Sequence, residues 1–252
     1  MYICKKQIKI STNKLHIEKF KSNFENIYSI LIVDIIDFYR KLDNKTKKST
    51  INWRIHKLVE KGIIQRIGRG KYTLGKQKIF IPIISNENEL LFSKLKEEFP
   101  YLNISIWSTK WLTPWMLHIP NKNKTIIEVE KGTEENVFYF LKDFKENIFL
   151  NPSNNILEKY AATNENIIII KNLITDAPLQ KIKKIQISSI EKILVDLIVE
   201  VEMFSEYQGV DLENIIENAF EYNTINTDKM LRYANRRRKK NIVQQKINNI
   251  LI

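Results

Sequence analysis

In the first 75 residues, apolar side chains recur at every third or fourth position, which is the spacing of amphipathic helices. The pattern predicts one helix over "STNKLHIEKFKSNF", with a Ser/Thr cap at its start, and a second over "IYSILIVDIIDFYRKL". One face of the second helix collects Ile32, Ile35, Ile36 and Tyr39. The polar stretch "DNKTKK" then predicts a turn. The beginning of the chain is therefore expected to be mostly helical.

The segment "STINWRIHKLVEKGIIQRIGRGKYTL" predicts a third helix that is followed at once by a hairpin. Ser49 or Thr50 is expected to cap this helix, and Gly62 to end it in the left-handed conformation. Two short strand-like runs then surround Gly68-Arg69-Gly70. The helix has an apolar face, and its opposite face carries Ser49, Trp53, His56, Lys57 and Glu60. Three helices and a basic hairpin predict a winged helix-turn-helix.

From about residue 79, strand-like and helical patterns alternate, which is typical of a central sheet with flanking helices. Strands are predicted over "KIFIPII", "YLNISIWS", "KTIIEVE" and "NIIIIK", and helices over "ENELLFSKLKEEF" and "EENVFYFLKDF". The end is predicted to be helical, over "SIEKILVDLIVEVEMF", "DLENIIENAFEY" and one basic helix, "DKMLRYANRRRKKNIVQQKINNIL". The predicted fold class is α+β or α/β, with a winged helix over residues 1–78 and an α/β domain over residues 79–252.

Charge is distributed unevenly along the chain, whose net charge is +12 over 252 residues. Residues 1–80 hold 19 Lys and Arg against 6 Asp and Glu, a balance of +13. Residues 81–228 hold 14 against 23, a balance of −9, and residues 229–252 hold 8 against none. A basic module beside an acidic one indicates that the first binds a polyanion. This asymmetry favours nucleic acid over a lysine-rich surface that is merely soluble.

Several classes of protein are disfavoured by what the sequence contains. A single cysteine, Cys4, excludes an intrachain disulfide, and no apolar run approaches the roughly 18 residues of a membrane span. The start, "MYICKKQIKI", lacks the order of a signal peptide. There is no GxGxxG, P-loop or GxSxG motif, and Cys4 and the three histidines lack zinc-ligand spacing. We expect a cytoplasmic protein that is not an enzyme and has no cofactor or metal.

Three segments resemble the AbiEi-type antitoxins, which are the regulators of type IV toxin–antitoxin systems. They are the helix and hairpin described above, the apolar helix "ISSIEKILVDLIVE", and the basic segment "KMLRYANRRRKKNIVQQKINNIL". The resemblance implies a DNA-binding repressor that regulates its own abortive-infection-like operon. It also implies antagonism of a nucleotidyltransferase-like toxin by the C-terminal domain, without a stable complex between the two proteins.

The candidate DNA-binding residues lie on the third helix and the hairpin. Outward helix residues can reach base edges in the major groove, and a basic hairpin can contact the backbone or the minor groove. Arg54 and Lys57 are candidate phosphate contacts, whereas Trp53 either contacts DNA or covers the preceding helix. The full set is Lys47, Lys48, Ser49, Thr50, Asn52, Trp53, Arg54, Lys57, Arg66, Arg69 and Lys71.

A second basic cluster lies near the end of the chain. It forms a second nucleic-acid or partner surface, or a solvated helix face, or it pairs with the acidic middle of the chain. Its members are Arg236, Arg237, Arg238, Lys239 and Lys240.

Two other functions stay open. The stretch "IEVEK" resembles the metal-binding strand of restriction-type nucleases, which would make the chain a metal-dependent nuclease targeted by a winged helix. Glu128 and Glu130 share a strand face that Lys131 does not, and no Asp lies between residues 44 and 142. The other alternative is an interaction module whose acidic domain binds a partner while the winged helix docks.

Two features of the second domain have both structural and functional interpretations. Glu191 and Asp196 interrupt an apolar helix, which predicts an internal ion pair or a cap, or else a surface patch for antitoxin action. Trp107, Trp111 and Trp115 are expected in the core, although an aromatic platform for a partner or nucleobase stays open.

Overall fold

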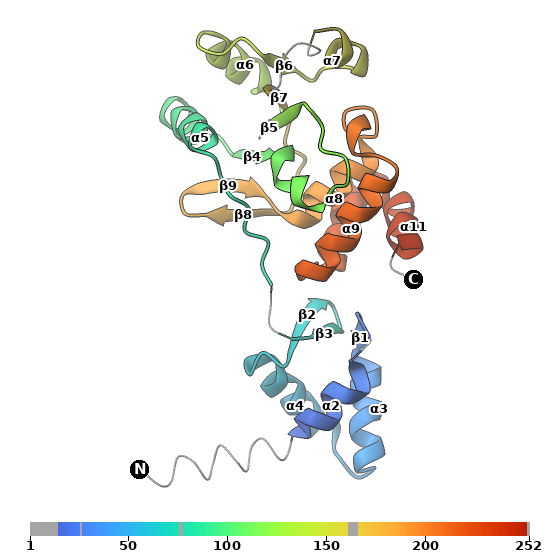
Figure 1. Ribbon diagram of the computed structural model, residues 1–252. Helices are drawn as coiled ribbons and strands as arrows, with labels where there is room; N and C mark the ends of the chain where they lie inside the picture. The colour runs from blue at the N-terminus through green and yellow to red at the C-terminus, as the bar shows by residue number, and fades with distance from the viewer. Residues whose placement is uncertain (1–14, 26, 76–77, 161–165, 251–252) are drawn as a thin grey trace. The chain divides into compact units, whose positions relative to one another are not determined.

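The computed structural model describes residues 15–25, 27–75, 78–160 and 166–250 (Figure 1). The chain has a mixed α+β fold, with one small sheet and one larger mixed sheet. It forms two compact units. Unit 1 comprises Met1–Ile79 with Asn226–Asp228, and unit 2 comprises Phe80–Ile225 with Lys229–Ile252. Within the described residues, no helix is both long enough and apolar enough to cross a membrane.

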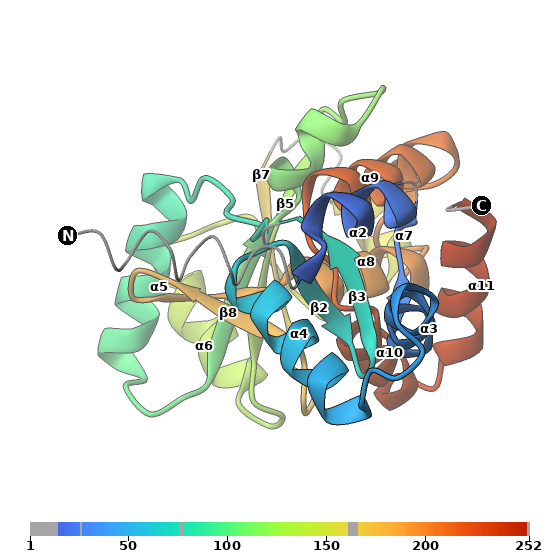
Figure 2. The same ribbon diagram turned by 90° about the horizontal axis from the view of Figure 1, so that it is seen from below.

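The described part of unit 1 contains three helices and a three-stranded antiparallel sheet. Its elements follow in the order α2 (Ile17–Phe24), β1 (Ile30–Leu31), α3 (Ile32–Leu42), α4 (Lys48–Glu60), β2 (Ile64–Gly68) and β3 (Lys71–Leu74). The strands lie in the order β1-β3-β2, so the short β1 pairs with the far side of the β2–β3 hairpin. Figure 2 shows α4 beside β2.

The core of unit 1 forms from the apolar faces that the sequence pattern predicts. Phe20 of α2 packs against Phe38 and Tyr39 of α3, with ring centroids 5.2 Å and 6.2 Å away. Ile51 and Ile55 of α4 are buried in the same cluster. The Tyr39 hydroxyl donates a hydrogen bond to the Leu15 carbonyl at 2.8 Å, which ties the chain before α2 to this core.

Helix boundaries in unit 1 differ from the prediction in three places. The second helix, predicted over residues 27–42, begins only at Ile32, because Ile30 and Leu31 pair with β3 as strand β1. The expected Ser/Thr cap of the first helix lies outside the described residues. The prediction that Ser49 or Thr50 caps α4 is wrong, because the helix already begins at Lys48 with Lys47 at the N-cap. The Lys47 carbonyl accepts the first helical hydrogen bond, from Ile51 N at 3.1 Å, which places Ser49 and Thr50 inside the first turn.

The C-terminal end of α4 and the hairpin that follows are as predicted. Gly62 has φ 65° and stands two residues beyond the helix. Its N–H bonds to the Val59 carbonyl and the N–H of Ile63 bonds to the Leu58 carbonyl, both at 2.9 Å, which is the Schellman arrangement. The turn between β2 and β3 has Gly70 at φ 70°.

Unit 2 is built around a six-stranded mixed sheet in the order β6-β7-β5-β4-β9-β8. The β5–β7, β6–β7 and β4–β9 pairs are parallel, whereas β4–β5 and β8–β9 are antiparallel. The strands are β4 (Ile104–Ser108), β5 (Asn123–Val129), β6 (Ile148–Leu150), β7 (Asn166–Asn172), β8 (Leu179–Ile182) and β9 (Ile185–Ser188).

Helices cover both faces of this sheet (Figure 1). Because strand side chains alternate between faces, Thr125 and Glu128 of β5 point in opposite directions. Thr125 bonds to Asn88 of α5, and Glu128 pairs with Lys192 of α8. The helical elements are α5 (Asn86–Glu98), η1 (Thr109–Trp115), α6 (Glu134–Lys142), α7 (Asn154–Tyr160), α8 (Ile190–Val199), η2 (Ser205–Tyr207), α9 (Val210–Tyr222), α10 (Thr227–Arg236) and α11 (Lys240–Ile250).

Two predicted elements of unit 2 are corrected by the structure. The stretch "KIFIPII" is not a strand: its chain runs outside the sheet, and Pro82 has no N–H to donate to a neighbouring strand. The single basic helix predicted over residues 228–251 is two helices, α10 and α11. The break falls at Arg238, whose φ of 58° cannot continue a right-handed helix.

Candidate functional site

Helix α4 presents a polar face to the outside of unit 1. Its first turn places Lys48, Ser49 and Thr50 at the surface, with Lys47 at the N-cap. No described side chain caps this end, so no capping oxygen occupies the N–H groups of the first turn. The predicted phosphate-contacting end of the helix is therefore exposed and lined by lysines.

The middle of the same face carries Asn52, Trp53 and His56, which are all exposed. Trp53 has 43% of its surface exposed, although Ile51 and Ile55 on either side of it are buried. Trp53 is therefore on the outward face and outside the buried core, where a planar aromatic ring can contact a ligand.

Arg54 and Lys57 flank this face and are held by neighbours within unit 1. The Arg54 guanidinium stacks over the Tyr39 ring, 4.7 Å from the centroid, and Lys57 forms an ion pair with Glu60. Burial raises the pKa of Tyr39 to about 12, so Tyr39 is a neutral platform for this cation. The Arg54 side chain is thus partly buried against Tyr39 of α3, and the Lys57 side chain is partly exposed to solvent.

The hairpin places its cations around the turn that joins β2 to β3. Arg66 and Arg69 are exposed, and the partly exposed Lys71 lies 3.7 Å from Asp228 Oδ1, with which it forms an ion pair. The pairing of the strands shifts between Arg66 and Gly68, and Arg66 Nε donates to the Gly68 carbonyl at 2.9 Å. The structure therefore brings together the three hairpin residues that the sequence predicted, at one end of the hairpin.

The second basic cluster does not form one surface. Arg238, Lys239 and Lys240 are exposed at the break between α10 and α11. Arg236 forms an ion pair with Asp176, and Arg237 lies inside unit 2. For Arg236 and Arg237 the structure bears out the alternative of pairing with the acidic middle of the chain.

A buried network of charges in unit 2 was largely missed by sequence reasoning. At its centre, the Lys192 ammonium lies 2.5 Å from Glu128 Oε2 and 2.5 Å from Asp196 Oδ2. Lys192 and Glu128 have no exposed surface, and Asp196 has 1%. The prediction that Asp196 forms an internal ion pair is confirmed. The signal that identified it was a charged residue flanked by aliphatic residues on an apolar helix.

The network continues toward the C-terminal helices. Arg237 bonds to Asp196 Oδ1 at 2.6 Å and to Glu200, which also pairs with Lys171 of β7. The Tyr233 hydroxyl donates to Asp196 Oδ1 at 2.9 Å. Among the described residues, three carboxylates thus face three cations, which is the balance that buried charges require.

The two central carboxylates have different environments. Burial raises the pKa of Glu128, and the nearby charge of Asp196 adds to this rise, although Lys192 acts in the opposite direction. Glu128 accepts a weak 3.3 Å hydrogen bond from Ser188, and its Oε1 has no hydrogen-bond donor among the described residues. Burial alone would also raise the pKa of Asp196, but the charges of Lys192 and its other cationic neighbours outweigh this effect and lower it. Asp196 is therefore the fixed anion of the network.

This geometry bears on the nuclease alternative. The Glu128 carboxylate is enclosed and bound to Lys192, so it is not presented to solvent. Glu130 follows the end of β5, is exposed, and accepts a hydrogen bond from Asn103 N at 3.2 Å. The two carboxylates do not converge on a common site. Across the described ranges of the chain, no group of three or more His, Cys, Asp or Glu is placed to hold a metal ion.

The sequence of this chain matches a family model over residues 50–252, and the chain belongs to that family, DUF6577, a family of unknown function. The match covers all of unit 2 and begins within α4 of unit 1. A comparison with curated proteins found no match.

Proposed function

We propose that the chain is a DNA-binding transcriptional repressor that acts as the antitoxin of a type IV toxin–antitoxin operon. Its DNA ligand is the operator of its own operon, and its antagonist is a nucleotidyltransferase-like toxin. The antitoxin part of the proposal rests on the resemblance of the helix–hairpin segment and the two C-terminal segments to AbiEi-type antitoxins.

The topology of unit 1 supports a winged helix. The order helix, strand, helix, helix, strand, strand, with the first strand beside the last, gives a three-helix core with a hairpin after the third helix. In proteins that bind DNA this way, the third helix enters the major groove and the hairpin contacts the adjacent backbone or minor groove. In the topology of this chain, α4 corresponds to that third helix and β2–β3 to that hairpin.

The observation that carries the proposal is the exposed face of α4. A surface helix that only covers a core needs no outward Trp, yet α4 presents Trp53 beside Asn52 and Ser49. Asn and Ser side chains both donate and accept hydrogen bonds, as base edges require. Lys48 at the helix start and Arg66 and Arg69 on the hairpin would add phosphate contacts at the margins of that face.

The proposal is tested by fluorescence anisotropy with DNA from the promoter of the operon, with scrambled DNA of equal length as the control. Wild-type protein should bind the promoter at least about tenfold more tightly, since specific complexes exceed nonspecific ones by far more than this. The hairpin variant Arg66→Gln/Arg69→Gln/Lys71→Gln should bind weakly. The negative slope of log affinity against log salt should become shallower by about 0.9 for each phosphate that the variant no longer neutralises.

A matched variant separates a specific contact from bulk charge. Lys181→Gln/Lys183→Gln/Lys184→Gln removes the same three charges from the β8–β9 hairpin of unit 2, where all three lysines are exposed. It should bind the promoter as the wild type does. Equal weakening in the two triple variants, or equal binding of promoter and scrambled DNA, would refute the proposal.

A further inference from the structure

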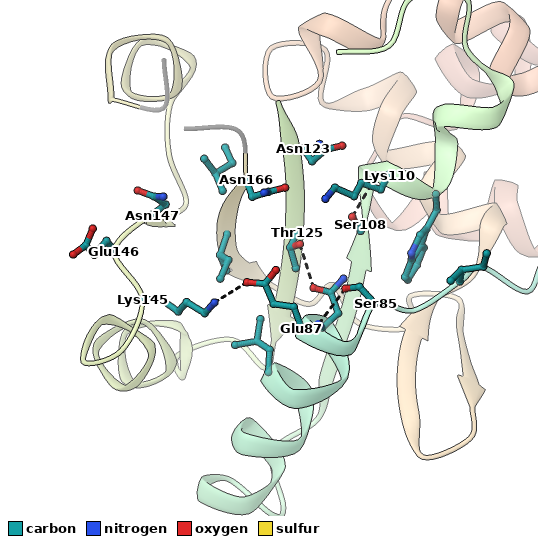
Figure 3. A pocket seen from close by; sticks show the side chains of 16 residues that line it. Ser85, Glu87, Ser108, Lys110, Asn123, Thr125, Lys145, Glu146, Asn147 and Asn166 are labelled. Carbon is teal, nitrogen blue, oxygen red and sulfur yellow. Dashed lines mark hydrogen bonds and ion pairs between the residues drawn. The ribbon is translucent and has the colours of Figure 1, made fainter. Parts of the chain in front are cut away.

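Unit 2 contains a cavity of ≈ 220 Å³ at one end of its six-stranded sheet (Figure 3). Strand β4 ends there with Ser108, and β5 and β7 begin there with Asn123 and Asn166. The start of α5, the start of η1, the segment 145–147 before β6, and Ile83 also line it. The cavity lies on the Thr125 side of the sheet, opposite the face that holds the buried charge network.

Four asparagines contribute carboxamide side chains to the polar lining. Asn123 and Asn166 are direct partners in the β5–β7 register, so their side chains project from the same face as neighbours. Asn147 joins them from the residue before β6. Within the described part of the chain, these three side chains make no hydrogen bond, whereas the Asn88 oxygen accepts one from Thr125. The cavity thus offers several free carboxamides, each able to donate and accept.

Among the described residues that line the cavity, one cation has no ion-pair partner. Lys145 is neutralised by Glu87, 2.6 Å away. Lys110 forms no ion pair with any described residue, and Figure 3 shows its ammonium and the Asn166 carboxamide pointing into the same space. Glu146 is directed away from the other polar side chains in that view. A ligand with a single anionic group matches this charge, and a polyphosphate does not.

An aromatic side chain completes the lining. Trp111 contributes to the wall, and Phe80 holds it in place with ring centroids 6.3 Å apart. An indole can contact a planar ring, and carboxamides match the alternating donors and acceptors along the edge of a nucleobase. At ≈ 220 Å³ the cavity is smaller than the usual site for a drug-sized ligand, which limits its occupant to a small molecule or one residue of a polymer.

We propose that this cavity binds a nucleoside 5′-monophosphate unit, with the base against Trp111 and the asparagine carboxamides and the phosphate on Lys110. The unit is either a free mononucleotide or the 5′-phosphorylated end of a nucleic-acid strand. The site is separate from α4 and the hairpin, so this inference does not depend on operator binding by unit 1.

Isothermal titration calorimetry of the full chain with the four ribonucleoside monophosphates and their unphosphorylated nucleosides tests the site. At least one monophosphate should bind about tenfold more tightly than its nucleoside, because the phosphate adds a contact of about 1.4 kcal/mol. Lys110→Gln should remove this preference and leave nucleoside affinity unchanged. Asn123→Ala and Asn166→Ala should each weaken both ligands by about tenfold. Lys131→Gln, on an exposed turn outside the cavity, should change neither affinity.

The source of the ligand is distinguished with a short 5′-phosphorylated oligonucleotide, titrated into the hairpin triple variant so that unit 1 contributes little. If the oligonucleotide competes with the monophosphate, and if this competition is lost in a protein that also carries Lys110→Gln, the ligand is a strand end. If only the monophosphate binds, the ligand is a free nucleotide. The proposal is overturned if no monophosphate binds at millimolar concentration. It is equally overturned if binding survives the Lys110, Asn123 and Asn166 substitutions in variants whose melting temperatures match the wild type.

Discussion

Lys192 is the residue on which the buried charges of unit 2 depend. Its ammonium is shared by Glu128 and Asp196, and the Tyr233 ring lies 5.5 Å from it. The two carboxylates raise the pKa of Lys192 against the effect of burial, so it stays charged. A lysine in this position is retained by its anions, because an ion in a dry interior is tolerated only with partners of opposite charge.

Removal of this ammonium should strongly destabilise unit 2. Lys192→Met keeps the length of the side chain but leaves two buried carboxylates short of a cation, which is expected to cost about 3–5 kcal/mol of unfolding free energy. Adding Glu128→Gln should recover part of the loss, because it removes the less well paired charge. Urea denaturation measures both variants, with exposed Lys184→Met as the control expected within about 0.5 kcal/mol of the wild type. A Lys192→Met protein as stable as that control would contradict this account of the network.

At the scale of elements, the hairpin and α4 are set by local sequence. Gly62 ends the helix, and the glycines around Arg69 permit the turn, so the register of β2 and β3 follows from neighbouring residues. Strands β8 and β9 lack such a signal, because "LQKI" and "IQIS" are short and mix polar with apolar side chains. The position of β9 is fixed by its parallel pairing with β4. Ile106 and Ile187 are direct partners in this pairing, although some eighty residues separate them in the sequence.

The end of α4 provides a test at this scale. Gly62→Ala places a Cβ at φ 65°, which should destabilise the junction between helix and hairpin by roughly 1–2 kcal/mol. Gly62→Asn should lose less, because Asn tolerates the left-handed conformation better. Hydrogen exchange of the peptides that cover residues 51–74 measures the effect locally. If the amides in both variants are protected as well as in the wild type, the left-handed conformation of residue 62 is not what stabilises this junction.

At the scale of the whole molecule, the alternation of basic, acidic and basic segments has more than one cause. Some cations of the first segment, among them Lys48, Arg66 and Arg69, are exposed on α4 and the hairpin, where they can meet a polyanion. Part of the positive charge of the last segment is consumed inside the chain, because Arg237 is bound by Asp196 and Glu200 and Arg236 by Asp176. A count of charges alone therefore overstates the second basic surface.

If DNA binding and antitoxin action belong to different units, one substitution should separate them. The full chain with Arg66→Gln/Arg69→Gln/Lys71→Gln should fail to repress a reporter driven by the promoter of the operon. The same protein should still protect cells that express the nucleotidyltransferase-like toxin of the operon. Immunoblots establish equal protein levels, and the Lys181/Lys183/Lys184 variant is the matched control. Loss of both activities in the hairpin variant alone would contradict this division of labour.

The sequence by itself determined the features that depend on near neighbours. Helical periodicity located most of the helices, Gly62 and the Gly68–Gly70 turn defined the end of α4 and the hairpin, and the cations of that hairpin could be named in advance. Asp196 could be predicted to need an internal partner, because a charge between Val195 and Leu197 on an apolar helix has little access to water.

Only the tertiary structure decided which distant residues meet. Glu128 and Lys192 are separated by more than sixty residues along the chain, and a strand pattern alone cannot show that α8 packs on the Glu128 face. The same holds for Asn123 and Asn166, which line one cavity because β5 and β7 pair in parallel at that register. Hydrophobic periodicity reports which side of an element is buried, whereas sheet order and helix packing determine what it is buried against.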